Sequence, residues 1–198
     1  EQFVTERNKK GLLKEEEYKE FMIYIVLDRA NKLSEKSYKD AIELIGQSIE
    51  TFGDDERLVK IKNGLINNWI VLYINKEDWD QVEELVQRFI VKGEITQEQW
   101  SKYMSMVYNS RAFIIAEEKG NLEAALYIKQ ALEIMENDKI LRANYENYLY
   151  NYTVVIHNKV VLLIQEKDYK QALELINEGL THVPDSSLLK KDLEKLRK

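Results

Sequence analysis

The apolar positions along the chain follow helical spacing, and strand-like alternation is hard to find anywhere. Long helical segments are predicted at 14–33, 55–76, 96–119 and 138–167. Helix signals mark their boundaries: Gly53 followed by Asp54 and Asp55 stands at the start of the second segment, Thr96 with Gln99 three residues later forms a capping box, and Asp138 is an N-cap. The pattern predicts an all-α fold.

Each long segment is followed by a shorter phrase, and the four phrases resemble one another: "SYKDAIELIGQSIETFGDD", "DWDQVEELVQRFIVKG", "GNLEAALYIKQALEIMEND" and "DYKQALELINEGLTHVPDS". In three of them an aromatic residue is followed three residues later by a smaller one, and a further position on the same helical face lies seven residues beyond that smaller residue. These positions are Tyr38, Ala41 and Ser48; Trp79, Val82 and Phe89; and Tyr169, Ala172 and Gly179. Ala124 and Ala131 keep the spacing in the third phrase, with a one-residue slip relative to Leu122. Small residues two turns apart predict close helix packing.

The repeat has a drifting period, because the spacings are 41 residues from Tyr38 to Trp79, 43 from Trp79 to Leu122 and 47 from Leu122 to Tyr169. We therefore expect a single domain over 1–198, with repeats at approximately 14–53, 55–93, 96–137 and 138–184 and a capping helix over 185–198. One face of that last helix is an apolar stripe of Leu188, Leu189, Leu193 and Leu196. Its other face is expected to be polar, with Lys190, Lys191, Asp192, Glu194 and Lys195.

The phrases resemble the tetratricopeptide repeat family. The fourth matches the family's second helix and closing proline through Tyr169, Ala172, Leu173, Gly179, Leu180 and Pro184, and the first matches through Tyr38, Ala41, Ile42, Ser48 and Ile49. The family's usual period is about 34 residues, so the repeats here are elongated. The resemblance implies a right-handed α-solenoid of about four helix-turn-helix repeats, whose first helices line a concave groove that binds peptides or protein segments.

The family pattern implies a set of inward positions on the first helices. They are Ile23, Val26 and Ala30; Asn67, Val71 and Ile74; Val107, Ser110 and Ile114; and Val154, His157, Val161 and Ile164. We take as candidate contacts Asn67, Val71, Ile74, Ser110, Ile114, His157 and Val161. The family's carboxylate-binding groove needs Lys, Arg and Asn at successive inward positions, and we expect no such clamp here.

The stretches "LINNWIVLYI" and "TVVIHNKVVLLI" are apolar on nearly all sides, which a helix tolerates when both faces are covered. Three explanations stay open at this point. Neighbouring helices bury both faces, an apolar peptide or partner helix fills the groove, or two copies dimerise through this surface.

The segment "RANYENYLYNY" gathers tyrosines and asparagines near a predicted helix start. Tyr145, Tyr148 and Tyr152 share one face and are expected to pack. Asn147 and Tyr150 lie opposite, so we predict exposed contacts with a ligand there.

Composition narrows the function classes. A net charge of −6 disfavours nonspecific nucleic-acid binding, which depends on neutralising phosphates. The apolar runs are too short to span a membrane, so we expect no membrane insertion and a cytoplasmic protein. The chain begins with Glu1 rather than Met, which indicates a fragment or a processed product.

The sequence contains few of the residue patterns that catalysis or metal binding requires. Cysteine is absent, no glycine cluster forms a phosphate loop, and His157 and His182 are 25 residues apart without further ligands nearby. We therefore expect no catalytic residues, no metal and no cofactor. His157 is expected to be a satisfied core residue, with a polar contact to a ligand or a pH-sensitive contact as alternatives.

The function expected from the sequence is thus a non-enzymatic scaffold that binds an apolar protein or peptide segment in its groove. The alternative is the peptide-sensing domain of a bacterial transcription regulator. Peptide sensors of the Rgg and PlcR type look similar in having elongated repeats after a DNA-binding domain, which this chain would lack.

Overall fold

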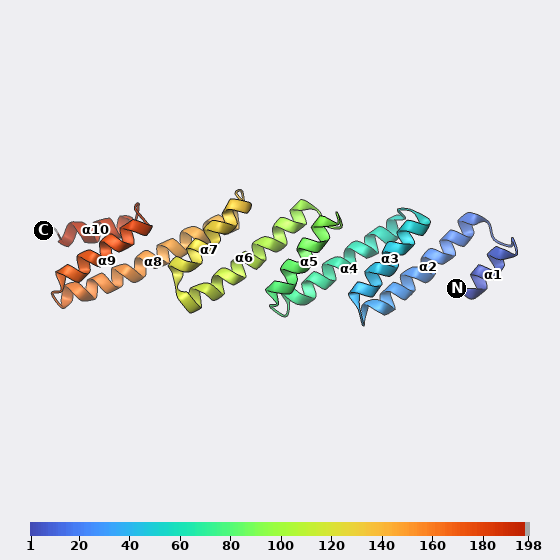
Figure 1. The fold of residues 1–198 in the computed structure, drawn as a ribbon, viewed down its shortest axis with the longest axis horizontal. Helices are drawn as coiled ribbons and strands as arrows, with labels where there is room; N and C mark the ends of the chain where they lie inside the picture. Colours follow the sequence, from blue (N-terminus) through green and yellow to red (C-terminus); the bar gives the residue numbers. More distant parts are fainter. Residues whose placement is uncertain (197–198) are drawn as a thin grey trace. The chain divides into compact units, whose positions relative to one another are not determined.

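A computed structural model describes residues 1–196, and within them the chain is all-α (Figure 1). The chain divides into two compact units, Glu1–Trp100 (unit 1) and the part that begins at Ser101 (unit 2). Consecutive helices pack against their neighbours inside each unit. The all-α prediction is confirmed, while the prediction of a single domain over 1–198 stays a prediction.

The long predicted segments are all helices, with ends within about two residues of those expected. They are α2 (Glu15–Ser34), α4 (Glu56–Ile74), α6 (Gln97–Lys119) and α8 (Lys139–Gln165), called the first helices below. The phrases form the second helices, which are α3 (Tyr38–Phe52), α5 (Trp79–Val91), α7 (Asn121–Ile134) and α9 (Tyr169–His182). The expected last helix is α10 (Ser187–Leu196), and residues 197 and 198 of that prediction lie outside the described residues. One helix was not predicted, α1 (Gln2–Lys9).

Side-chain caps explain why the helices begin where they do. The Ser37, Asp55, Asp78, Asp138 and Asp168 side chains each accept a hydrogen bond from a backbone N–H of the first turn that follows. The capping box before α6 is confirmed, since the Thr96 N–H donates to Gln99 Oε1 at 2.8 Å and the Gln99 N–H donates to Thr96 Oγ1 at 3.2 Å.

The predicted close-packing positions of the second helices are buried. They are Ala41 and Ser48 of α3, Val82 and Phe89 of α5, Ala124 and Ala131 of α7, and Ala172 and Gly179 of α9. In every pair the first member follows the helix N-cap by four residues, so the third phrase has no slip in this respect. The difference lies in the residue that opens the helix, because α7 begins with Asn121 instead of an aromatic residue.

Gly179 shows why one of these positions is small. A Cβ atom there would lie 2.7 Å from Ile156 Cδ1 and 2.7 Å from Leu189 Cδ1. Gly179 therefore lets α9 approach both α8 and α10. The buried cluster around this contact consists of Ile156, Val160, Ala172, Ile176 and Leu189.

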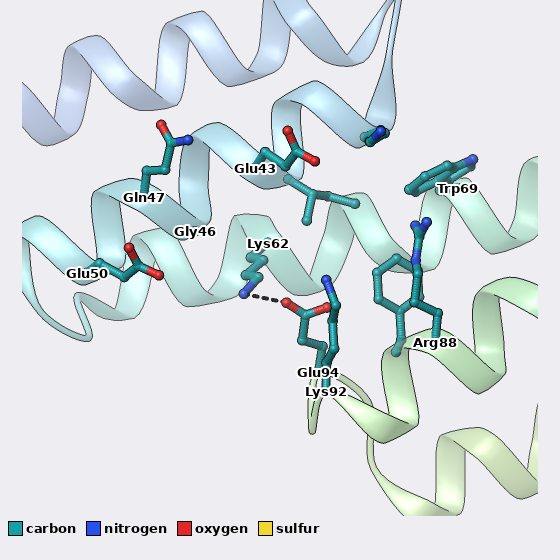
Figure 2. Close-up of a pocket in the computed structure, with 12 residues that line it drawn as sticks. Glu43, Gly46, Gln47, Glu50, Lys62, Trp69, Arg88, Lys92 and Glu94 are labelled. Carbon is teal, nitrogen blue, oxygen red and sulfur yellow. Dashed lines mark ion pairs between the residues drawn. The ribbon is translucent and has the colours of Figure 1, made fainter.

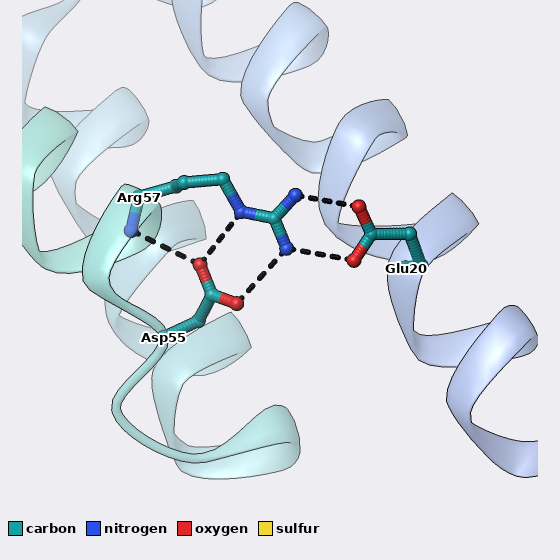
Figure 3. A network of polar contacts seen from close by, with 3 residues as sticks. All are labelled: Glu20, Asp55 and Arg57. Carbon is teal, nitrogen blue, oxygen red and sulfur yellow. Dashed lines mark hydrogen bonds and ion pairs between the residues drawn. The ribbon is translucent and has the colours of Figure 1, made fainter.

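Helices α2 and α4 of unit 1 are joined by a polar network around Arg57 (Figure 3). The guanidinium donates to both carboxylate oxygens of Glu20, at 2.8 and 3.0 Å, and to both oxygens of Asp55, at 3.0 Å each. Hydrogen bonds from Arg57 lower the pKa of Asp55 to about 2 and also lower the pKa of Glu20. Because Asp55 is also the N-cap of α4, the network fixes the start of this helix against α2.

Candidate functional site

The first helices can be compared from a buried residue near the end of each one. Ile70 of α4, Ala112 of α6 and Val160 of α8 are completely buried, and each precedes the next N-cap by eight residues. The two residues that follow each anchor are exposed and apolar. We call them the apolar pairs, and they are Val71 and Leu72, Phe113 and Ile114, and Val161 and Leu162.

The exposure of the apolar pairs is substantial. Phe113 is 61% exposed and Leu162 is 57% exposed, and the least exposed members, Val71 and Val161, are each 36% exposed. Single apolar residues scattered over a surface are normal and need no explanation. Here, however, large apolar side chains are exposed at the equivalent position of three helices. The pairs are therefore a repeated surface feature of the chain.

A polar residue precedes each apolar pair by about one helical turn. These residues are Asn68, Ser110 and Asn158, each ten residues before the following N-cap. Asn68 and Asn158 are exposed and Ser110 is half-buried. Since residues three and four apart share a helical face, α4, α6 and α8 each carry an amide or hydroxyl group beside the apolar pair.

Helix α2 differs from the other first helices, and the difference corrects the expected register. Ala30 is its buried anchor, yet Ser37 follows Ala30 by seven residues instead of eight. The connections after α4 and α8 are one residue longer, and each contains a residue with left-handed backbone, Glu77 (φ 55°) and Lys167 (φ 63°). One residue turns a helical position by about 100°. For this reason Ala30, which the predicted alignment places with Val71 and Val161, is buried in the core.

The predicted inward positions therefore divide into two groups. Ile23, Val26, Ala30 and Val107 are buried core residues, and the expectation that they line a groove is wrong. Val71, Ile114 and Val161 are exposed members of the apolar pairs, Asn67 is exposed, and Ile74, Ser110, Val154 and Ile164 are half-buried. Their role in binding stays a prediction. The alignment with the family pattern missed Leu72, Phe113 and Leu162. Aligning the first helices on the N-cap residue that follows each of them brings these three residues into the apolar pairs.

The tyrosine-rich segment of α8 separates as expected. Tyr145, Tyr148 and Tyr152 are half-buried, and burial raises the pKa of Tyr148 and of Tyr152. Asn147 and Tyr150 are exposed on the opposite side. The predicted burial is thus confirmed, whereas contact of Asn147 and Tyr150 with a ligand stays a prediction.

His157 is half-buried and has a partner that lies 35 residues away in the sequence. Its Nδ1 lies 2.5 Å from Oδ2 of Asp192 on α10, and Lys195 Nζ lies 3.4 Å from the other oxygen of the same carboxylate. Asp192 is 2% exposed, so its predicted place on a polar outer face is wrong. A buried carboxylate needs such partners, and His157 therefore holds α10 against α8.

Unit 1 contains a polar cavity of about 410 Å³ among α3, α4 and α5 (Figure 2). Lys62 and Glu94 form an ion pair of 2.8 Å beside it. The guanidinium of Arg88 lies over the Trp69 ring, 4.8 Å from its centroid. No residue of this cavity was predicted as a contact, since helical spacing alone does not show that charges from α3 and α5 face one space.

Residues 1–196 contain no cluster of three or more His, Cys, Asp or Glu side chains that could hold a metal ion. None of the helices that the structure describes is long and apolar enough to cross a bilayer.

No protein-family model, curated protein or solved structure matches the chain. The functional interpretation therefore depends on the residues of this chain.

Proposed function

We propose that the chain is a non-enzymatic binding module with tetratricopeptide-like repeats, and that its first helices hold an apolar segment of another protein. The observation that carries the proposal is the recurrence of exposed apolar pairs after the buried anchors Ile70, Ala112 and Val160. Helix α2 has Asn31 and Lys32 at the equivalent position, both exposed. A first helix can therefore form with a polar pair, and the apolar pairs need another reason.

The energetics decide how long the bound segment must be. Complete burial of one exposed aliphatic or aromatic side chain contributes about 1.5–3 kcal/mol, and the pairs are already partly covered, so each side chain would add roughly 1 kcal/mol. Association costs about 4 kcal/mol or more in lost freedom of motion. A single pair is therefore too weak, and the bound segment has to contact two pairs of one unit, such as those of α6 and α8 in unit 2.

The polar residues beside the pairs suit a peptide chain. An extended segment or a helix end carries backbone N–H and C=O groups that lose water on binding and need new partners. Side-chain amides both donate and accept, so Asn68 and Asn158 can serve either group, and the Ser110 hydroxyl can do the same on α6. Apolar pairs would hold side chains of the segment while these polar groups bind its backbone.

A peptide-display selection tests the proposal. The full chain is compared with a Val71→Glu, Val161→Glu variant, and circular dichroism is recorded for both. The matched control is Asn31→Glu with Asn177→Glu, which adds the same charge at exposed positions of α2 and α9. We expect peptides rich in apolar residues to bind the wild type and the control, and to bind the variant at least tenfold more weakly.

Two results would contradict the proposal. Equal binding of the selected peptides to the variant would show that the apolar pairs are not the binding surface. Loss of helical structure in the variant would show that Val71 and Val161 belong to the core.

A further inference from the structure

The polar cavity of unit 1 has two walls of opposite charge. One wall is the face of α3, where Glu43, Gln47 and Glu50 line one side of the helix and Lys39 lies one turn before Glu43. Arg88 of α5 and Lys92, which directly follows α5, supply positive charge to the cavity, together with Lys62 of α4 (Figure 2). The volume of about 410 Å³ lies within the range of about 300–1,000 Å³ that is typical of small-molecule sites.

The charges of the two walls do not neutralise one another. Within residues 1–196, Glu43 and Glu50 form no ion pair with Arg88 or Lys92. Among residues 1–196, the ion pair at the cavity joins Lys62 to Glu94, and Lys39 forms no ion pair with Glu43 or Glu50. The α3 side of the cavity therefore keeps a net negative charge from Lys39, Glu43 and Glu50, and the opposite side keeps a net positive charge from Lys62, Arg88, Lys92 and Glu94.

Among the residues that the structure describes, Arg88 is held in place without an acidic partner. Its guanidinium lies 4.8 Å from the centroid of Trp69 and 5.0 Å from the centroid of Phe89, so two aromatic rings position it. Cation–π contacts of this kind leave the outer N–H groups of an arginine able to donate to a carboxylate. Arg88 therefore offers a fixed anion-binding group at one end of the cavity.

Gly46 keeps the α3 wall open at its middle. A glycine inside a helix costs about 1 kcal/mol relative to alanine. Packing does not require this glycine, because a Cβ atom at Gly46 would meet nothing closer than Lys62 Nζ, at 4.0 Å. A larger side chain at this position would enter the cavity between Glu43 and Glu50.

We propose that this cavity binds a small zwitterion, a free α-amino acid. Its ammonium group would lie towards Glu43 and Glu50, and its carboxylate towards Arg88 and Lys92. A simple anion would face the two α3 carboxylates, and a simple cation would face the basic groups, so either would meet repulsion from one wall. A ligand with both charges matches both walls. The site uses none of the apolar pairs and is independent of the binding function proposed above.

The test is a titration of the full chain with each of the common free amino acids, followed by the indole N–H signal of Trp69 in NMR spectra. For every amino acid that binds, the matched amine and the matched carboxylic acid, each lacking the other charged group, are titrated in the same way. We expect at least one amino acid to shift the Trp69 signal in a saturable manner. Both single-charge analogues should bind at least tenfold more weakly.

Variants separate the site from general effects. Gly46→Leu should abolish the Trp69 response by filling the cavity, whereas Gly46→Ala should keep it, because the added methyl group fits. Glu43→Gln with Glu50→Gln changes exposed side chains and should weaken binding at least tenfold, which keeps the test decisive if Gly46→Leu does not fold.

Three outcomes would overturn the proposal. The first is the absence of any Trp69 shift at about 10 mM of each amino acid, well above the 1 mM dissociation constant that corresponds to about −4.1 kcal/mol. The second is equal binding of the carboxylic acid alone, which would indicate an anion site. The third is unchanged binding in the Glu43→Gln, Glu50→Gln variant.

Discussion

Helices α2 and α8 each bury one residue near their C-terminal end, but they differ in the exposed residues that follow it. Each has a completely buried anchor near its end, Ala30 in α2 and Val160 in α8. The next two residues are Asn31 and Lys32 in α2 but Val161 and Leu162 in α8. Since α2 packs against α3 with a polar pair, the fold does not require apolar residues at this position. The apolar pair of α8 is therefore available for binding.

The two helices also differ in how they are held. An exposed network around Arg57 joins α2 to α4, whereas α8 is fixed by the close approach at Gly179 and by the contact of His157 with the buried Asp192. Stability should therefore depend strongly on the inner face of α8, weakly on the polar contacts of α2, and hardly at all on the outer face of α8.

The largest effect on stability is expected where Gly179 of α9 packs against the inner face of α8. Gly179→Val places a branched side chain where even a Cβ atom would lie 2.7 Å from Ile156 and Leu189, so overpacking should lower the free energy of unfolding by about 2–3 kcal/mol. Gly64→Val is the matched control, because Gly64 of α4 has nothing within 4 Å of an added Cβ, and it should change stability by less than about 0.5 kcal/mol. Urea unfolding measures both, and equal losses would contradict the packing described for Gly179.

A somewhat smaller effect is expected from His157→Ala. The change removes the main partner of the buried Asp192 carboxylate, and removing one member of a buried pair costs about 3–5 kcal/mol. Since His157 is only half-buried and Lys195 stays near Asp192, we expect about 2 kcal/mol. His157→Gln keeps a donor and should lose less. If His157→Ala and Asp192→Asn each lower stability but their double variant is fully additive, the contact does not join α8 to α10.

The network of α2 and α4 should contribute less, and in a pH-dependent way. Arg57 lowers the pKa of Asp55 from 3.8 to about 2 in the folded state. A lowered folded-state pKa adds stability that is fully present above about pH 4 and is lost as the pH falls towards 2. After allowance for solvent screening, Asp55→Asn should cost about 1 kcal/mol near pH 6. Unfolding curves of the two proteins should converge at about pH 2, and a difference that is constant with pH would contradict this assignment.

The smallest effect on stability is expected at the outer face of α8. Replacing its apolar pair with the polar pair of α2, as Val161→Asn with Leu162→Lys, should change the free energy of unfolding by less than about 0.5 kcal/mol, because surface substitutions rarely do more. Val160→Asn at the neighbouring buried position should instead unfold or strongly destabilise unit 2. Urea unfolding of the two variants shows whether the boundary between core and surface lies between residues 160 and 161.

Local signals in the sequence were enough to predict most of the helices. N-cap residues such as Asp138 and the pair Thr96 and Gln99 act within one turn, so their positions mark helix starts without knowledge of the fold. The buried pair Ala124 and Ala131 could be predicted for a similar reason, since seven-residue spacing is a property of one helix.

The features that were missed depend on contacts between distant residues or on connection length. The partner of His157 is Asp192, and no local pattern distinguishes this aspartate from the charged residues around it. The register of α2 depended on a connection one residue shorter than those after α4 and α8, which moved Ala30 from the surface to the core. The cavity beside Arg88 requires side chains from three helices, so it too could be found only in the structure.

The central claim is that the apolar pairs bind a protein segment and are not needed for folding. The most direct test is the affinity of the Val161→Asn, Leu162→Lys variant for peptides selected on the wild-type chain, with the exposed change Asn177→Lys as the control for added positive charge. We predict a loss of affinity of at least tenfold in a variant whose unfolding curve matches that of the wild type. Unchanged affinity in the folded variant would contradict the claim.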